Sequence, residues 1–211
     1  MKVAVLSESS ADEAAVRLLV EAVLGVRTTS PEPLTLRSRG WPAVRDVLPA
    51  VIRHLHFQTD VEGLVVVADS DRSVIHTGQH DVLEDGQPGC RVCELRNVHL
   101  LTGRRMAERV GRAPLNVAVG VAVPAVEGWY ARCVVPHVNE AAWSRALQSG
   151  QFPFTKVSLK ETVYGTPRPS ILLETERALE AANRLVYDIG GLEADFPGGF
   201  GALAADLRRW V

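Results

Sequence analysis

Acidic residues follow three apolar segments of this 211-residue chain. They are Glu8 after residues 2–6, Asp69 and Asp71 after residues 63–68, and Glu127 after residues 117–123. Carboxylates that are brought together repel one another unless a cation binds between them, and their hard oxygen atoms favour Mg²⁺ or Mn²⁺. These four residues, called the strand-end acids below, therefore predict a divalent-metal site if the three segments end at one place.

The three apolar segments have the pattern of buried parallel strands. Residues 63–68 are continuously apolar rather than alternating, as in a strand that helices cover on both faces. Helical spacing of apolar residues lies between the segments, as at Val16, Leu19 and Val20. The sequence predicts an α/β fold with a mostly parallel sheet flanked by helices, in which ligands bind at the carboxyl ends of the strands.

Local signals refine the expected elements. Ser10 and Glu13 have capping-box spacing before the first helix, and Gly25 should end it. Pro49 should kink the second helix or mark its start. Other expected elements are a short strand at 34–37, a helix reaching 106–110, helices at 139–148 and 170–189, and a C-terminal helical stripe formed by Phe200, Leu203, Leu207 and Trp210.

Length favours one elaborated domain spanning residues 1–211. We expect a loop insertion at 72–97, after the Asp-x-Asp strand, and a helical C-terminal extension at 137–211. We find no internal repeat and no low-complexity linker.

Each strand-end acid also has a structural interpretation. Glu8 suits a helix N-terminus, Asp69 and Asp71 suit a turn, and Glu127 suits a solvated helix. Their joint occurrence at one predicted edge favours the metal site. The i, i+2 spacing of the two aspartates adds to this, because alternate side chains of an extended segment point the same way.

The acids lie in sequence contexts that resemble the Toprim domain, the fold shared by primases, type II topoisomerases, recombination-repair proteins and OLD-family nucleases. The opening segment 5–13 resembles the Toprim pattern of a hydrophobic strand followed by Glu, and Asp69-Ser70-Asp71 resembles its later Asp-x-Asp. Segment 123–129, with Pro124, Glu127 and Trp129, resembles a Pro-x-x-Glu-x-Trp element of bacterial Toprim-like proteins, which are often encoded beside ATPases in defence-like loci. Segments 155–160 and 200–210 are similar to that group as well.

The resemblance implies roles for individual residues. Glu8 would be a metal ligand or general base, Asp69 and Asp71 metal ligands, and Glu127 a further acid of the OLD-like type. Either Lys156 or Lys160 would neutralise charge. Two features depart from the pattern: Ser9 stands where a glycine commonly follows the first Glu, and the stretch after Asp71 is longer than a minimal Toprim domain requires.

These roles predict a divalent-metal-dependent nuclease, or nuclease-like subunit, that hydrolyses nucleic-acid phosphodiesters. The resemblance further implies an ATPase partner in a defence or repair system. A catalytically silent Toprim-like subunit that binds a partner or regulates it remains an alternative. A receiver-type signalling domain, phosphorylated on Asp, is a third, which the length and Glu127 weaken.

Histidines and cysteines form a second candidate site. His76 and His80 precede Cys90 and Cys93, and four N and S ligands within 18 residues can form a tetrahedral Zn²⁺ site. Metal would order a loop that has little core of its own. A redox Cys-x-x-Cys and plain loop residues remain alternatives, and Cys133 is expected in the core.

Charge and composition limit the partners. Lys plus Arg number 23 against 25 Asp plus Glu, which excludes a strongly basic nucleic-acid binder. Nucleic acid, DNA in the first place, would be held by local contacts or through metal. We find no signal peptide or long apolar run, so we expect a cytoplasmic protein without membrane contact. A homo-oligomer is compatible with the sequence.

Overall fold

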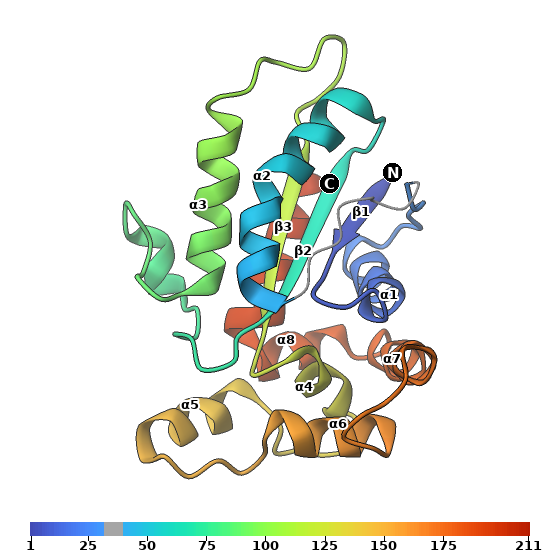
Figure 1. The fold of residues 1–211 in the computed structure, drawn as a ribbon, viewed down its shortest axis with the longest axis vertical. Helices are drawn as coiled ribbons and strands as arrows, with labels where there is room; N and C mark the ends of the chain where they lie inside the picture. The colour runs from blue at the N-terminus through green and yellow to red at the C-terminus, as the bar shows by residue number, and fades with distance from the viewer. Residues whose placement is uncertain (32–39) are drawn as a thin grey trace.

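The computed structural model describes residues 1–31 and 40–211, so the strand predicted at 34–37 lies outside the described residues. In the described part, strands β1 (Val3–Leu6), β2 (Gly63–Asp69) and β3 (Asn116–Ala122) form one sheet in the order β1-β2-β3 (Figure 1). Both strand pairs are parallel. The predicted α/β class with a parallel sheet is therefore confirmed.

Strand register brings the carboxyl ends of the strands to one edge. Val66 of β2 pairs with Leu6 at the end of β1, and Asp69 pairs with Ala122 at the end of β3. Beyond the strands, the backbone N–H of Ser70 donates to the Ala122 carbonyl over 2.7 Å. The segments that carry the strand-end acids therefore leave the sheet side by side.

Both faces of the sheet are buried, as the continuous apolar segments predict. Val5, Val65 and Val67 belong to one hydrophobic cluster, whereas Leu64 and Val66 belong to a second cluster on the other face. Alternate strand residues point to opposite faces, which explains this division within β2.

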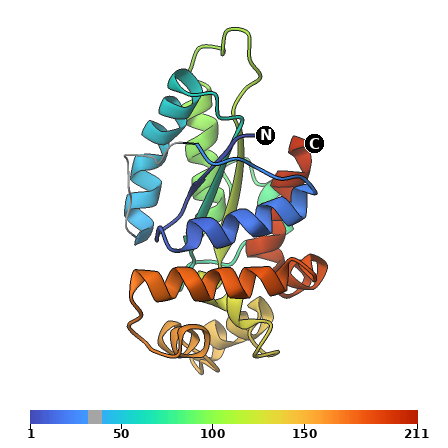
Figure 2. The same cartoon turned by 90° about the vertical axis from the view of Figure 1, so that its right-hand side faces the viewer.

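Helices α1 (Asp12–Leu24) and α9 (Ala202–Leu207) cover the first face, and helices α2 (Gly40–Gln58) and α3 (Arg91–Gly103) cover the second (Figure 2). Helix α7 (Ile171–Leu185) packs against α1. The sheet is thus the middle of three layers.

The remaining helices lie across the carboxyl ends of the strands, at the lower end of Figure 1. They are α4 (Val126–Ala131), α5 (Glu140–Ser149), α6 (Lys156–Tyr164) and α8 (Ile189–Asp195). Helix α6 begins with a capping box in which Thr155 and Ser158 bond reciprocally. That cap fixes the start of the helix that carries both candidate lysines.

Short helical turns complete the chain. They are η1 (Gly78–Val82), the π-helical η2 (Pro197–Gly201) and η3 (Arg208–Trp210). The predicted C-terminal stripe is confirmed, since Phe200, Leu203 and Leu207 are buried. The Trp210 ring lies against Gly63, where a Cβ would come within 2.4 Å of it.

Several predicted helix boundaries were wrong. Helix α1 is capped at Ala11 rather than by a Ser10 capping box, although Gly25 ends it in the left-handed conformation as predicted. Of the two alternatives for Pro49, only the helix start is wrong, because Pro49 lies inside α2. Helix α3 ends at Gly103, short of residues 106–110, and the helix expected over 170–189 ends at Leu185.

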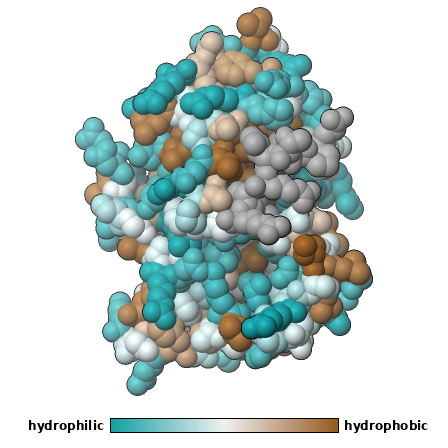
Figure 3. Space-filling view, in the orientation of Figure 1, coloured by the Kyte–Doolittle hydropathy of each residue, from teal (hydrophilic) through white to brown (hydrophobic). Residues whose placement is uncertain are grey.

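The surface in Figure 3 is mixed, with hydrophobic residues scattered among hydrophilic ones. Among the helices of the described residues, none has both the length and the apolar character needed to cross a membrane.

Candidate functional site

Glu8 and Asp69 meet at the carboxyl edge of the sheet. The Asp69 backbone N–H donates to Glu8 Oε1 over 2.9 Å, and the backbone N–H of Val126, the first residue of α4, donates to Asp69 Oδ1 over 3.0 Å. Glu127 follows Val126 in the same helical turn and is buried. The three strand ends therefore bring the strand-end acids to one place, as predicted.

Lys156 lies between the two aspartates. Its Nζ is 2.8 Å from Asp69 Oδ2 and also contacts Asp71 Oδ1. On the other side of Asp71, Arg91 Nη1 donates to Oδ2 over 2.8 Å and to the Asp69 carbonyl over 2.5 Å. Both carboxylates thus face the same cation.

The route by which the aspartates come together differs from the prediction. Asp71 has a φ of 52°, in the left-handed region, so the segment after Asp69 turns instead of continuing as a strand. The Asp71 backbone N–H holds this turn by donating to the Pro124 carbonyl over 2.9 Å. A turn, rather than alternation along an extended strand, places both side chains beside Lys156.

Lys160 serves a second group of acids. Its Nζ lies 3.5 Å from Glu127 Oε1 and 3.4 Å from Glu174 Oε1, a residue of α7. Positions i and i+4 share one face of a helix, so α6 directs Lys156 and Lys160 to the same edge. The two lysines thus neutralise adjacent acid groups.

Two further acids were not predicted as site residues. Glu174 is the partner of Lys160, and Asp12 is buried at the start of α1, where its Oδ1 accepts a hydrogen bond from the Tyr130 hydroxyl over 3.2 Å. Acidic residues are common in the first turn of a helix, which hid the role of Asp12. We call Glu8, Asp12, Asp69, Asp71, Glu127 and Glu174 the acidic edge.

Burial and mutual repulsion raise several pKa values at the acidic edge. Burial, followed by the charge of Asp69, raises the pKa of Glu8 to about 6. Burial, followed by the charges of Glu127 and Asp69, raises the pKa of Asp12 well above its ordinary value. Burial and then Asp69 also raise the pKa of Glu127. Asp69 acts on all three groups, so the acids form one electrostatic unit.

Asp71 behaves differently. Burial alone would raise its pKa, but hydrogen bonds from Lys156 and Arg91 outweigh burial and lower it. The acidic edge therefore contains a firmly ionised Asp71 together with Glu8, Asp12 and Glu127, which hold protons more tightly.

The acidic edge has the donor chemistry for Mg²⁺ or Mn²⁺, because its side chains offer carboxylate oxygens from several elements. Four of the six carboxylates, those of Asp69, Asp71, Glu127 and Glu174, pair with the three cations Lys156, Lys160 and Arg91, so negative charge is in excess when all six are ionised. A divalent cation bound between Asp69 and Asp71 would take the place of the Lys156 ammonium group.

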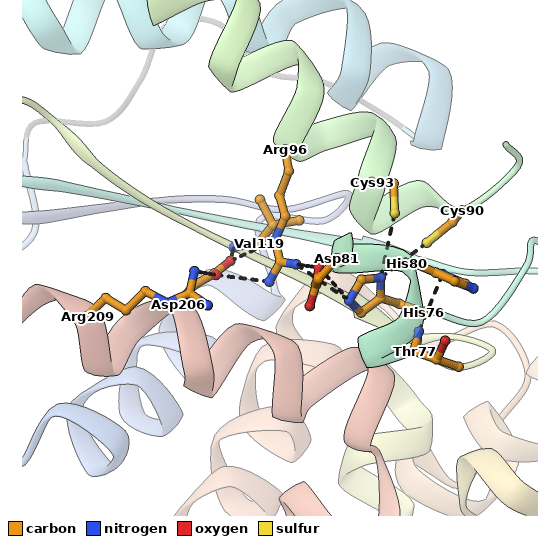
Figure 4. A network of polar contacts seen from close by, with 10 residues as sticks. All are labelled: His76, Thr77, His80, Asp81, Cys90, Cys93, Arg96, Val119, Asp206 and Arg209. Atoms are coloured by element: carbon orange, nitrogen blue, oxygen red, sulfur yellow. Dashed lines mark hydrogen bonds and ion pairs between the residues drawn. The ribbon is translucent and has the colours of Figure 1, made fainter. Parts of the chain in front are cut away.

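The predicted His/Cys group, consisting of His76, His80, Cys90 and Cys93, does come together. One ligand atom from each residue lies within 4.8 Å of the others, and among the described residues this group could hold a metal ion. His76 Nδ1 is 3.5 Å from Cys90 Sγ and 3.7 Å from Cys93 Sγ (Figure 4).

The cysteines are free thiols in the structure. Burial raises the pKa of the Cys90 thiol to about 12 and lowers the pKa of His76, so both groups are neutral at pH 7 without a cation. Cys133 is exposed, and its predicted place in the core was wrong.

No protein-family model, curated protein or solved structure matches the chain. The three-stranded parallel sheet with helices on both faces is consistent with the Rossmann-like class. The narrower resemblance to Toprim domains stays a prediction, and the functional interpretation depends on the chain's own residues.

Proposed function

We propose that the chain is a divalent-metal-dependent nuclease, or a nuclease-like subunit, that hydrolyses nucleic-acid phosphodiesters. The observation that supports this proposal most is the convergence of carboxylates from the sheet edge, α4 and α7 around two lysines of one helix. Carboxylates and ammonium groups side by side can serve a reaction in which a cation and a phosphate occupy the same site.

Each residue has a role that follows from its surroundings. Glu8, whose pKa is about 6, is suited to accept a proton from water near neutral pH. Asp69, Asp71 and Glu127 would bind Mg²⁺ or Mn²⁺, which supplies stabilisation of charge on the attacking and leaving oxygens. Lys156 and Lys160 would donate to phosphoryl oxygens as negative charge develops there.

The partners follow from the charge distribution. The chain as a whole is near neutral, with a formal net charge of -2, so a broad basic surface is not its means of holding DNA. We propose that DNA contacts the acidic edge locally, through the bound metal ion and through Lys156 and Lys160. An ATPase partner would make further contacts with the DNA. The resemblance to Toprim-like proteins, rather than any contact in the structure, is the basis for that partner.

A catalytically silent partner-binding subunit is the second candidate. The observation in its favour is that Lys156 already pairs with both Asp69 and Asp71. The Lys156 ammonium group then balances part of the charge of the two aspartates without a metal ion. A catalytically silent subunit would need such an arrangement.

We also propose Zn²⁺ at the His/Cys group, because its four N and S ligand atoms lie within 4.8 Å of one another. A reducing compartment such as the cytoplasm, expected from the sequence, would keep Cys90 and Cys93 as thiols able to bind it.

The test compares wild type with Asp69→Asn on supercoiled DNA, linear DNA and RNA, each with Mg²⁺ or Mn²⁺. Asn retains the oxygen that accepts from Val126 N–H but loses the negative charge. Asp46→Asn, on the exposed surface of α2, is the matched control. We expect cleavage by wild type and by the control, and a loss of about 100-fold or more in Asp69→Asn.

Binding of Mn²⁺, measured by calorimetry on the same three proteins, separates the candidates. Mn²⁺ binding that Asp69→Asn abolishes, without cleavage of any substrate, would support the silent subunit. Cleavage that is equal in all three proteins would reject the acidic edge as an active site, and labelling of Asp69 by acetyl phosphate would favour a receiver.

A further inference from the structure

We infer that the His/Cys group is a structural Zn²⁺ site with two sulfur and two nitrogen ligands, which orders the segment between β2 and α3. This inference does not depend on nuclease activity. Two ligands of a tetrahedral Zn²⁺ ion, with Zn–S of about 2.3 Å and Zn–N of about 2.0–2.1 Å, lie about 3.6 Å apart. His76 Nδ1 lies 3.5 Å and 3.7 Å from the two sulfurs, which matches that separation.

Hydrogen bonding alone does not explain this arrangement. A ring nitrogen carries either one N–H or one lone pair, so His76 Nδ1 can make one directed bond. Yet it faces Cys90 Sγ and Cys93 Sγ at nearly equal distances, and His80 offers a ligand atom within 4.8 Å of all three. A cation at the centre of the group satisfies the four ligands together, and tetrahedral S₂N₂ coordination favours Zn²⁺.

The other nitrogen of His76 has the partner that zinc ligands usually have. His76 Nε2 lies 3.4 Å from Asp81 Oδ1, an arrangement that orients the ring and leaves Nδ1 for the metal. Arg96 Nη1 in turn donates to Asp81 Oδ1 over 2.7 Å. Asp81 therefore orients the His76 ring, and Arg96 in turn fixes the position of Asp81.

This outer network reaches the core of the molecule (Figure 4). Arg96 bonds both carboxylate oxygens of the buried Asp206, over 3.2 Å and 2.9 Å. Asp206 Oδ2 also accepts from the backbone N–H of Val119 in β3 over 3.2 Å. The chain of contacts joins the loop, α3, α9 and the sheet, so the carboxylate that orients His76 is tied to the core.

The loop has few apolar contacts to hold it. Val74 is 44% exposed, Val82 is 83% exposed and Leu83 is 45% exposed. Gly86 packs directly on Cys93, where a Cβ would come within 2.7 Å of the Cys93 Cβ. The loop thus packs against Cys93 and not against a hydrophobic cluster of its own. Metal binding can order a loop of this kind.

Metal at this site would also fix Arg91, which contacts two residues of the acidic edge. Arg91 lies between Cys90 and Cys93 in the first turn of α3 and donates to Asp71 and to the Asp69 carbonyl. An ion that binds both Cys90 and Cys93 would fix the first turn of α3, and with it the position of Arg91. The Zn²⁺ site would therefore help to set the geometry of the Asp69–Asp71 turn.

Elemental analysis of the purified full chain tests this inference. We expect about one Zn²⁺ per chain, falling to near zero in Cys90→Ser and in Cys93→Ser. Cys133→Ser is the matched control, since Cys133 is an exposed free thiol outside the group. Zinc that is absent from wild type, or that is lost equally in Cys133→Ser, would overturn the inference.

Cobalt keeps the inference testable if the cysteine variants fail to fold. Addition of Co²⁺ to the metal-free wild type should give the visible absorption of tetrahedral cobalt bound to thiolates. Asp81→Asn should weaken metal binding about 10- to 100-fold, whereas Asp85→Asn, an exposed acid of the same loop, should not. An absence of the thiolate spectrum, or a Cys90–Cys93 disulfide in freshly purified protein, would contradict the Zn²⁺ site.

Discussion

The acidic edge and the His/Cys group both include residues at or after the end of β2, but they are assembled in different ways. Carboxylates of the acidic edge come from strand ends and helices that the two hydrophobic clusters hold in place, and Lys156 and Lys160 neutralise part of their charge. His76, whose ring is buried, and His80 lie on a loop with exposed apolar side chains, and His76 Nδ1 contacts the thiols of Cys90 and Cys93. One site is built by the fold, whereas the other needs a cation to hold it together.

This difference implies different consequences of losing metal. An acidic edge that retains its lysines should keep its shape without a divalent cation, because ammonium groups replace part of the missing charge. The His/Cys group has no such replacement, so its loop should open. The predictions below test this contrast, beginning with the largest expected effect.

Replacing the proposed base should abolish activity and leave the fold intact. Glu8→Gln retains an oxygen for the Asp69 N–H but can no longer accept a proton, so cleavage should fall about 100- to 10,000-fold. Nicking assays measure the loss, and circular dichroism checks the fold. Full activity of Glu8→Gln would remove Glu8 from the mechanism.

Removing Zn²⁺ with a chelator should loosen one region and not the other. Residues 72–90 should exchange their amide hydrogens about 100-fold faster, the factor expected when a ligand present at 100 times its Kd is withdrawn. Exchange should not change in α4, which carries Glu127 of the acidic edge, or in α6, which carries Lys156 and Lys160. Hydrogen exchange followed by mass spectrometry gives both results at once, and equal loosening of the two regions would remove the contrast between them.

Glu140, a buried acid outside the acidic edge, allows the pH dependence of stability to be tested. Glu140 accepts hydrogen bonds from the backbone N–H groups of Gly198 and Gly199, over 2.7 Å and 2.6 Å, and burial raises its pKa to about 7. A pKa above the ordinary value of 4.5 means that the folded state favours protonated Glu140. Its contribution to stability is therefore complete below about pH 4.5 and is lost as the pH rises through about 7.

The expected size of this loss is about 3 kcal/mol, from 1.36 kcal/mol for each pKa unit. Denaturant titrations at several pH values should show that Glu140→Gln removes this part of the pH dependence of the unfolding free energy. Glu176→Gln, on the exposed surface of α7, is the control and should retain it. A pH dependence that is the same in both variants would reject the raised pKa.

Removing Lys156 should destabilise the metal-free protein by about 1–3 kcal/mol. Fully buried ion pairs cost about 3–5 kcal/mol to break, but the Lys156 side chain is 36% exposed, so solvent screening reduces the loss. Mn²⁺ should restore stability to Lys156→Met by binding between Asp69 and Asp71. Lys2→Met is the matched control, because the partner of Lys2, Asp60, is 62% exposed whereas Asp69 is 18% exposed, so its loss should be less than about 1 kcal/mol. Failure of Mn²⁺ to restore stability would indicate that lysine, not metal, is the natural cation here.

Much of the fold followed from local patterns. Residues 63–68 are continuously apolar, and they form the central strand because only a position between two helical layers buries both faces. Boundaries were harder, as the wrong capping box at Ser10 shows. There the chain turns through Ser9, whose side chain accepts from the Ala11 N–H over 3.2 Å, and helix α1 starts one residue later.

The candidate sites were predictable to different degrees. His76, His80, Cys90 and Cys93 lie close in sequence, so their spacing was enough to group them. Asp206 lies 110 residues from its partner Arg96, and Glu174 reaches the acidic edge from α7. Such contacts depend on how helices pack, which local patterns do not encode. Asp71 was assigned correctly to the edge but for the wrong reason, because the turn at its positive φ could not be foreseen.

A crystal structure of the full chain grown with Mn²⁺, with anomalous data at the manganese and zinc absorption edges, tests most directly whether the two regions hold different cations. We predict manganese at the acidic edge, in contact with Asp69 and Asp71 and with Lys156 displaced, and zinc at the His/Cys group. Saturating Mn²⁺ that leaves Lys156 Nζ between Asp69 and Asp71, with no anomalous peak at the acidic edge, would contradict this account.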